Sequence, residues 1–301
     1  MGTRVSDRPL HLRKPSWLKV HLPNPQSARP VERILRTWGL HTVCESALCP
    51  NRAECFSCGT ATFLIMGDVC TRACRFCAVP KGTPTPLDPN EPVRVAEAAG
   101  VLGLRHVVVT SVSRDDLMDG GAAHFVATIR AVRSSLPTAK VEILIPDFQG
   151  RWWALDQVLE ERPEVLNHNL ETAPRLYPLV RPGADYKRSL DLLSRAAKAD
   201  GVVVKTGWMV GLGEKEQEIL ALFREVAAAG VQIVTVGQYL RPTVRQLPVA
   251  EYVSPEKFAF YQEYGESLGL VVYAGPLVRS SYRAGESLSL ISVSGRPGGS
   301  T

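Results

Sequence analysis

The chain has 301 residues, of which 45% are hydrophobic and 22% are charged, ordinary values for a soluble globular protein with an ample core. No apolar run approaches the ~18 residues of a membrane span, and the basic N-terminus lacks the apolar core of a secretory signal, so we expect a cytoplasmic protein with no membrane association. The net charge of +5 comes without a basic block interleaved with aromatics. This argues against nucleic acid and favours an acidic protein or an anionic small molecule as partner.

The first 60 residues are predicted to be largely irregular. The stretch "PNPQSARP" (23–30) reads as a linker, and "VERILRTWGL" (31–40) as a short helix. Four cysteines follow, the first three at C-x4-C-x5-C spacing: Cys44, Cys49, Cys55 and Cys58. Four such thiols suit a zinc site or an all-cysteine cluster, and the spacing does not choose between these.

All seven cysteines of the chain lie within residues 44–77. An odd count without a secretory signal argues against a disulfide framework, and scattered buried thiols would not gather in this way. The segment is therefore interpreted as metal-binding, in a reducing compartment.

From residue 60 the chain alternates short apolar runs with amphipathic stretches, which predicts strands and helices in turn. The expected strands are 60–67, 106–110, 141–146, 165–170, 202–210, 231–240 and 270–275. The expected helices between them are 91–103, 122–136, 152–161, 186–199, 214–230 and 255–269. Such alternation predicts a parallel sheet covered by helices.

Six strand–helix units suit an open doubly wound sheet or a partial barrel. The Gly-x-Gly-x-x-Gly turn of a dinucleotide fold is missing after the first strand, so we expect the α/β class and a partial (β/α)6 TIM-type barrel, whose loops after the strands build the site. An N-terminal extension (1–59) and a C-terminal segment (276–301) would cover the mouth of the barrel (60–275). The last dozen residues are predicted to be disordered.

The loop after the first expected strand, "CTRACRFCAVP", carries Cys70, Cys74 and Cys77 at C-x3-C-x2-C spacing. Structural zinc takes four ligands, and no histidine nearby completes this set. A four-iron cubane on three cysteines leaves one iron open, which the amine and carboxylate of S-adenosylmethionine can chelate. One electron added to the sulfonium would then release a 5′-deoxyadenosyl radical, and Phe76 before the last cysteine is typical of that chemistry. A zinc or electron-transfer site is the alternative.

The end of the fourth expected strand offers further contacts to S-adenosylmethionine. "NHNLET" contains Asn167, Asn169 and Glu171, and strand alternation would put Asn167 and Asn169 on one face. Their polar groups suit ribose hydroxyls or the methionine moiety. A strand-end polar network without a ligand is the alternative.

The fifth expected strand and its loop supply the remaining candidates for cofactor binding. Lys205 lies in an otherwise apolar strand, and a buried lysine must be paired or must meet an anion. Gly211 and Gly213 would permit close approach of the backbone to an adenine. For Lys205 the alternative is a paired structural lysine.

Several motifs together resemble the lipoyl synthase family. These are "CESALCPNRAEC" before "GTATFLIMGDVCTRACRFCAV", then "NHNLETAPRLY", and "GPLVRSSYRAGE" near the C-terminus. The resemblance implies a radical S-adenosylmethionine enzyme on a partial β/α barrel, with a radical-generating [4Fe–4S] cluster on Cys70, Cys74 and Cys77.

The resemblance also implies a second, auxiliary [4Fe–4S] cluster. Its ligands would be Cys44, Cys49 and Cys55, with Ser281 of the "RSSY" motif as a labile fourth ligand and Ser280 as the fallback. Because serine oxygen is a hard donor for soft iron, its bond should be the one that opens. The cluster would donate two sulfur atoms, to C6 and C8 of a protein-bound octanoyl chain.

The resemblance further implies the partners of the reaction. They are octanoylated lipoyl-carrier proteins, such as lipoyl domains of 2-oxoacid dehydrogenases and the glycine cleavage H protein, and an electron donor such as flavodoxin or ferredoxin. We expect a monomer.

Two positions depart from the family pattern, and two other functions stay open. Cys58 could compete with Ser281 as a ligand, and Gln246 stands where the family commonly has His. A sulfur-inserting enzyme of biotin-synthase type is one alternative, although no cysteine follows Cys77 to serve it. A non-enzymatic iron–sulfur electron carrier is the other.

Overall fold

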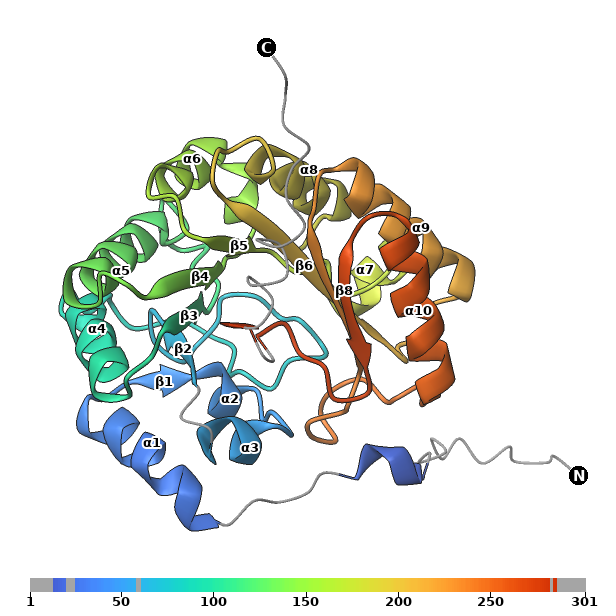
Figure 1. Cartoon of the computed structure of the whole chain (residues 1–301), viewed down its shortest axis with the longest axis horizontal. Helices are drawn as coiled ribbons and strands as arrows, with labels where there is room; N and C mark the ends of the chain where they lie inside the picture. The colour runs from blue at the N-terminus through green and yellow to red at the C-terminus, as the bar shows by residue number, and fades with distance from the viewer. Residues whose placement is uncertain (1–12, 20–24, 58–60, 282–283, 286–301) are drawn as a thin grey trace, which may run out of the picture.

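The computed structural model describes residues 13–19, 25–57, 61–281 and 284–285. Within them, an eight-stranded sheet follows chain order from β1 to β8, antiparallel between β1 and β2 and parallel from β2 to β8 (Figure 1). The strands are β1 (His41–Thr42), β2 (Thr62–Ile65), β3 (His106–Ser111), β4 (Lys140–Leu144), β5 (Val165–Asn167), β6 (Val203–Val210), β7 (Ile233–Gln238) and β8 (Val271–Gly275). The expected parallel sheet is confirmed.

Helices surround this sheet on its outer side (Figure 1). Those that connect the strands are α4 (Glu91–Val101), α5 (Ala122–Ser135), α6 (Trp152–Glu160), α7 (Tyr177–Val180), α8 (Tyr186–Ala196), α9 (Glu216–Ala228) and α10 (Pro255–Ser267). Before the barrel lie α1 (Pro25–Thr37), α2 (Val43–Ser46) and α3 (Arg52–Ser57). Short 3-10 turns cover Ser16–Leu18, Phe148–Gly150 and Pro174–Leu176.

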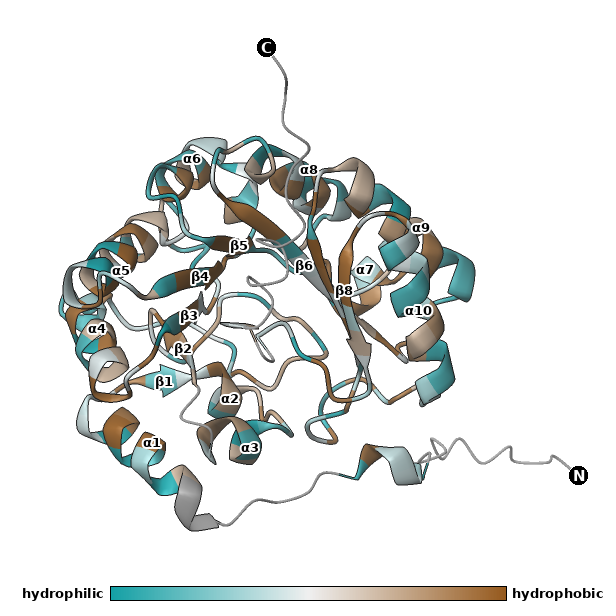
Figure 2. Cartoon of the chain, viewed as in Figure 1, coloured by the Kyte–Doolittle hydropathy of each residue, from teal (hydrophilic) through white to brown (hydrophobic). Residues whose placement is uncertain are grey.

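The strands are apolar because helices cover one side and the barrel interior the other. All four residues of β2 are buried, as are all six of β7. The helices are amphipathic: α8 begins at the cap Asp185, which accepts a hydrogen bond from the Arg188 N–H, and buries Leu192 and Leu193. Figure 2 shows hydrophobic residues on the strands and on the helix sides that face them.

The barrel is open between its edge strands, since β1 and β8 stand at opposite ends of the described sheet. Figure 1 shows α2 and α3 near this opening. The Asn51 side chain before α3 donates to the carbonyl of Leu277, 2.6 Å away, just after β8. Chain segments from before and after the barrel therefore meet at the gap, and the expected partial barrel is confirmed.

One expectation for the N-terminal part was wrong, and one strand was missed. The predicted linker 23–30 contributes to α1, which begins at Pro25. Val31 and Leu35, four residues apart, are both buried, and α1 packs on α3 and α4. Tertiary packing thus overrides the weak local helix signal around Pro30. The short strand β1 was not predicted, because two residues carry no periodicity.

The strand predicted at 165–170 ends at Asn167. The carbonyls of Asn169 and Leu170 accept hydrogen bonds from the Arg181 guanidinium, at 3.0 and 3.2 Å, in place of a neighbouring strand. The regular ladder is therefore interrupted after Asn167, and the chain pairs with β6 again at the isolated bridge between Glu171 and Trp208. The predicted disorder of the last dozen residues lies outside the described residues.

Candidate active site

The three-cysteine loop follows β2 and is fixed by backbone hydrogen bonds to its own far end. The Cys70 N–H donates to the carbonyl of Pro80 at 2.8 Å, and the Gly82 N–H donates to the carbonyl of Cys70 at 3.1 Å. The Ser113 N–H, from the loop after β3, donates to the Cys70 sulfur at 3.3 Å. The loop is thus ordered by the barrel around it.

Arg72, between the first two cysteines of this loop, is the buried centre of an ion-pair network. Its Nε lies 2.7 Å from Asp115 Oδ2 and its Nη2 2.9 Å from Asp115 Oδ1, and Nη2 also donates to Asp147. Asp147 is fully buried and is held on its other oxygen by Arg188 at 2.8 Å. Burial alone would raise the pKa of Asp147, but these arginines hold it well below its usual range.

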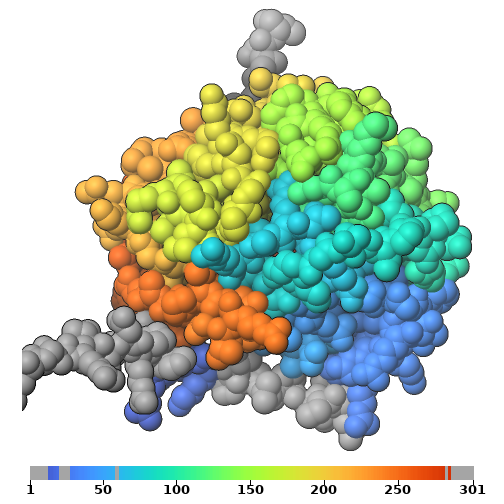
Figure 3. Space-filling model, turned by 180° about the vertical axis from the view of Figure 1, so that it is seen from behind, coloured from blue at the N-terminus to red at the C-terminus, as the bar shows by residue number. Residues whose placement is uncertain are grey.

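Two further loops close over the cysteine loop. The Arg75 N–H donates to the carbonyl of Val180 at 2.9 Å, and the Leu247 N–H donates to the carbonyl of Arg75 at 3.1 Å. Gln246, the position that departs from the family pattern, donates through Nε2 to the carbonyl of Cys77 at 3.3 Å. Figure 3 shows this face, with the cysteine-loop stretch (cyan) between the stretch around residue 180 (yellow-green) and that around 245 (orange).

The first cysteine group stands on two short helices before β2. Cys44 is in α2, which Thr42 caps by accepting from the Glu45 N–H at 3.3 Å. Cys49 follows α2, and Cys55 lies in α3. The expectation for Cys58 lies outside the described residues.

The "RSSY" segment returns to the barrel after β8. The Asn169 side chain donates to Ser280 Oγ at 2.6 Å, and Thr62 Oγ1 donates to Ser281 Oγ at 2.9 Å. These bonds join residues more than 100 positions apart, so the C-terminal segment reaches β2 and the end of β5 together.

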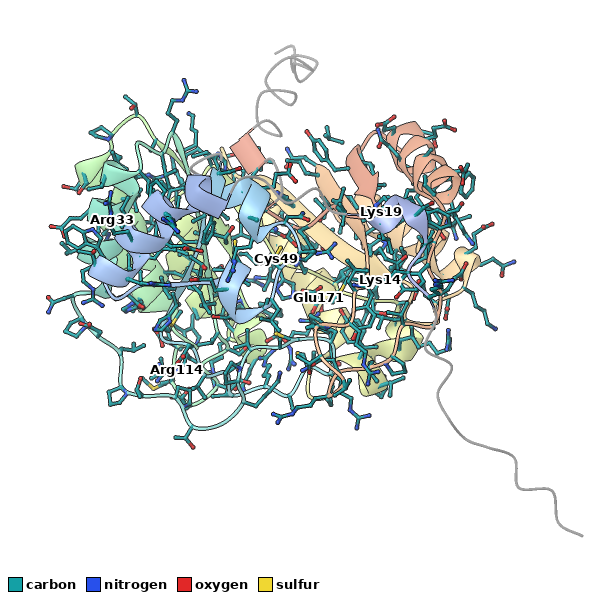
Figure 4. The ribbon with its side chains drawn as sticks, turned by 90° about the horizontal axis from the view of Figure 1, so that it is seen from below. Lys14, Lys19, Arg33, Cys49, Arg114 and Glu171 are labelled. Carbon is teal, nitrogen blue, oxygen red and sulfur yellow. The ribbon has the colours of Figure 1, made fainter. Side chains whose placement is uncertain are left out.

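All these elements surround one cavity of about 510 Å³, within the usual range for small-molecule sites. Its lining includes both predicted ligand groups: Cys44, Cys49, Cys55, Cys70, Cys74, Cys77 and Ser281. Among the described residues no three His, Cys, Asp or Glu side chains converge on a single ion, whereas a cubane holds each thiolate on a separate iron. Figure 4 shows Cys49 and Glu171 near the centre of the molecule, and Arg33 and Arg114 toward its edge.

Two of the predicted S-adenosylmethionine contacts line this cavity, Asn169 and Glu171. The Asn169 amide donates to Glu171 Oε1 at 3.1 Å. Burial raises the pKa of Glu171, and the nearby Arg181 charge opposes that shift. The Asn169–Glu171 pair therefore presents polar atoms to the cavity beside the three-cysteine loop.

Lys205 lies elsewhere. It is buried inside the barrel, where Nζ donates to Glu142 Oε1 at 2.8 Å, and it does not line the cavity. His106 contacts the other oxygen of Glu142 at 3.1 Å. The geometry supports the alternative of a paired structural lysine over a cofactor contact.

Asn167, Gly211 and Gly213 also lie outside the cavity lining. Gly211 has φ +97°, and a Cβ there would collide with Gln238 and with the carbonyl of Glu251. Close packing within the protein accounts for this glycine. The structure therefore lends no support to an adenine contact at Gly211 and Gly213, or to a ribose or methionine contact at Asn167.

Arg181 lines the cavity although no sequence pattern predicted a role for it. Its guanidinium is buried and donates to the Tyr177 hydroxyl at 3.2 Å, while its Nε has no partner among the described residues. Its local sequence, "LVRPG", resembles an ordinary surface turn. Only the fold brings this charge beside Cys74 and Glu171.

The polar atoms and thiols that line the cavity suit a polar cofactor and metal clusters as ligands. Buried polar atoms normally have partners, yet several atoms of the lining have none among the described residues: Asn51 Oδ1, Ser111 Oγ, Asn169 Oδ1, Arg181 Nε and Trp208 Nε1. Burial raises the pKa of the Cys44 and Cys77 thiols to about 11 and also raises that of Cys74. Thiolates in such a place need cations, which cluster irons supply.

Comparison with known sequences gives consistent matches. Residues 64–226 match the model of the Radical SAM superfamily. The chain is 54% identical over 281 residues to the lipoyl synthase of Caldanaerobacter subterraneus subsp. tengcongensis, covering 93% of this chain and 98% of that protein. It is 53% identical over 275 residues to the lipoyl synthase of Rubrobacter xylanophilus, covering 91% and 86%.

Solved structures share the fold at low sequence identity. Streptococcus suis SuiB bound to S-adenosylmethionine superposes with a TM-score of 0.56 at 12% identity, over 71% of this chain and 50% of that chain. Methylornithine synthase (PylB) superposes with a TM-score of 0.51 at 15% identity, over 83% and 78%. At such low identity these two likenesses show a shared fold and no more.

Proposed function

This chain belongs to the lipoyl synthase family of radical S-adenosylmethionine enzymes, and from that premise we propose how its residues share the work. The activity is the insertion of two sulfur atoms at C6 and C8 of a protein-bound octanoyl chain, a sulfurtransferase reaction that uses two [4Fe–4S] clusters and S-adenosylmethionine. With family membership shown, the biotin-synthase and electron-carrier alternatives are set aside.

Cys70, Cys74 and Cys77 would hold the radical-generating cluster, at which S-adenosylmethionine would bind. The rigid loop supports this role, since it is tied to Pro80, Ser113 and Val180 by backbone hydrogen bonds. The cofactor supplies a carbon radical, which unactivated C–H bonds require because they have no acidic proton for a base to remove.

Cys44, Cys49, Cys55 and Ser281 would hold the auxiliary cluster, which would supply the inserted sulfur. One observation carries this proposal: the two cysteine groups and Ser281 line a single cavity, although more than 200 residues separate Ser281 from the cysteines. A sulfur donor must lie beside the carbon from which hydrogen is removed, because a carbon radical reacts with whatever it meets first.

Asn169 and Glu171 bind S-adenosylmethionine, with Arg181 beside them. The three side chains line the cavity next to Cys74, and they combine an amide, a carboxyl group and a fixed cation. Such a set suits a ligand that carries an amine, a carboxylate and ribose hydroxyls.

The protein substrate is an octanoylated lipoyl-carrier protein, from a 2-oxoacid dehydrogenase or the glycine cleavage system, and flavodoxin or ferredoxin supplies electrons. The cations Lys14, Lys81 and Arg241 line the cavity, and both lysines are exposed, so an acidic partner fits the entrance. Among the described residues no helix has the length and apolar character to cross a bilayer. We place the enzyme in the cytoplasm as a monomer.

Two triple variants test the division of labour. With Cys44, Cys49 and Cys55 all changed to Ala, the protein should still form 5′-deoxyadenosine but no thiolated product. With Cys70, Cys74 and Cys77 all changed to Ala, both should be lost. Each variant should keep about half the iron of the reconstituted wild type. Loss of 5′-deoxyadenosine in the first variant, under a strong reductant, would refute the assignment.

A further inference from the structure

Thr62 is hydrogen-bonded to the serine that we propose as a ligand of the auxiliary cluster. It is the first residue of β2, is 4% exposed and lines the cavity. Its hydroxyl donates to Ser281 Oγ at 2.9 Å, and Cys44, another proposed ligand of the auxiliary cluster, lines the same cavity. Among the described residues, Thr62 is the one side chain that forms a hydrogen bond with the Ser281 hydroxyl.

We propose that Thr62 is a positioning residue that keeps Ser281 bound as a cluster ligand until sulfur transfer begins. The inference rests on the proposed function, because it takes Ser281 as the oxygen ligand of the auxiliary cluster. Beyond the proposed function, the inference names the Thr62 hydroxyl as the group that determines how firmly the Ser281 oxygen stays bound.

The direction of the effect follows from the charge on the serine oxygen. A ligating serine has lost its proton and carries negative charge, whereas a released serine is a neutral hydroxyl. A hydrogen bond to an ionised oxygen is about twice as strong as one to a neutral oxygen. Thr62 therefore stabilises the ligated form more than the released form, and the buried setting adds to the difference.

Other hydrogen bonds anchor the C-terminal segment that contains Ser281, so Thr62 is not needed to hold that segment in place. Asn169 holds the neighbouring Ser280 at 2.6 Å, and Asn51 holds the carbonyl of Leu277 at 2.6 Å. These bonds fix the backbone without Thr62. Removing the Thr62 hydroxyl should therefore change the hydrogen bonding of the Ser281 oxygen and leave the path of the chain as it is.

The test measures how fast an iron chelator strips the auxiliary cluster, in full-length protein that also carries Cys70→Ala, Cys74→Ala and Cys77→Ala. Thr62→Val keeps the shape and β-branching of threonine but removes the donor, and cluster loss should become roughly five-fold faster. Thr62→Ser keeps the hydroxyl, so its rate should stay near that of the parent. Thr206→Val is the matched control, because Thr206 is a fully buried threonine that does not line the cavity, and its hydroxyl donates to the carbonyl of His168.

A second background tests whether Thr62 acts through the serine oxygen. A thiolate accepts hydrogen bonds weakly, so in protein that also carries Ser281→Cys the Thr62→Val change should leave the rate of cluster loss unaltered. An equal acceleration in both backgrounds would show a merely structural role and overturn the inference.

The outcomes also separate this inference from the proposed function. If the triple-alanine protein with Thr62 intact takes up iron with a normal four-iron spectrum, and Thr62→Val loses it no faster, the inference alone fails. If that protein takes up no iron, the assignment of the auxiliary ligands fails, and the inference falls with it.

Discussion

At the scale of single residues, Lys205 and Glu142 form a buried ion pair within the barrel, and the partly buried His106 contacts Glu142. Burial alone would raise the pKa of Glu142, but the charge of Lys205 and the hydrogen bond from His106 lower it. Lys205 and Glu142 are each 1% exposed. The pair therefore contributes to stability only as long as both members are present.

Lys205→Met should destabilise the protein by about 3–5 kcal/mol, because it leaves the buried carboxylate of Glu142 without its ammonium partner. The double variant Lys205→Met, Glu142→Leu should recover much of that loss, since no unpaired charge remains. Urea unfolding measures both. Affinity for S-adenosylmethionine should stay near that of the wild type in the double variant, and a large loss would revive Lys205 as a cofactor contact.

His168 is buried and neutral beside the cavity. Burial lowers its pKa to about 4, and the charge of Arg181 adds to the shift. Its ring bonds the carbonyl of Ile145 at 2.8 Å and the Ser189 hydroxyl at 3.0 Å.

Since the unfolded chain titrates near 6.5, it binds more protons than the folded chain between pH 6.5 and 4. Stability due to His168 is therefore full above pH 6.5 and falls with pH, by about 3 kcal/mol at pH 4. Unfolding by urea across this range should show a steeper acid loss for the wild type than for His168→Gln. Parallel curves would contradict the assignment.

At the scale of elements, the cysteine loop depends on the fork of Arg72. Two nitrogens of the guanidinium hold Asp115, and one of these also holds Asp147. Lysine cannot reproduce this planar fork. The loop geometry for the first cluster thus relies on the loops after β3 and β4.

Arg72→Lys should reduce iron bound at Cys70, Cys74 and Cys77 and slow 5′-deoxyadenosine formation by at least ten-fold, while the auxiliary cluster keeps its iron. Iron content and spectra of each cluster measure this. Arg130→Lys is the control: its pair with Glu161 is at the surface, with the Arg130 side chain 70% exposed, and such pairs are worth under ~1 kcal/mol. Equal effects of the two substitutions would contradict the argument.

At the scale of the whole molecule, the chain carries a net charge of +5, and several of its cations lie around the cavity. Lys14 is exposed and lines it. Because the Debye length is ~10 Å at 0.1 M salt, any steering of an acidic carrier should weaken as salt rises.

Lys14→Glu should slow turnover of an octanoylated carrier protein several-fold at low salt and hardly affect a short octanoyl-lysine peptide. Lys198→Glu makes the same charge change at an exposed position outside the cavity and should have little effect. Steady-state rates from low to high salt provide the measurement. Equal slowing by both substitutions would leave only a general charge effect and exclude docking at the entrance.

Local patterns determined the fold class and the kind of chemistry. Alternating apolar runs and amphipathic stretches need only neighbours within one element, so strands β2 to β8 and helices α4, α5, α6, α8, α9 and α10 were predicted. Cysteine spacing is equally local, because three thiols on one short loop can reach the same cluster whatever the rest of the chain does. That spacing alone therefore identified the three-cysteine loop.

Only the tertiary structure decided which distant groups meet. Ser281 beside Thr62, Arg181 beside Glu171, and Lys205 paired with Glu142 all join residues that no sequence period relates. Helix α1 exists because its apolar side packs on α3 and α4, which overrides weak local propensity. The physical reason is the same in each case. The free energy of a buried polar or apolar contact depends on the partner residue, and the fold of the barrel determines which residue lies next to it.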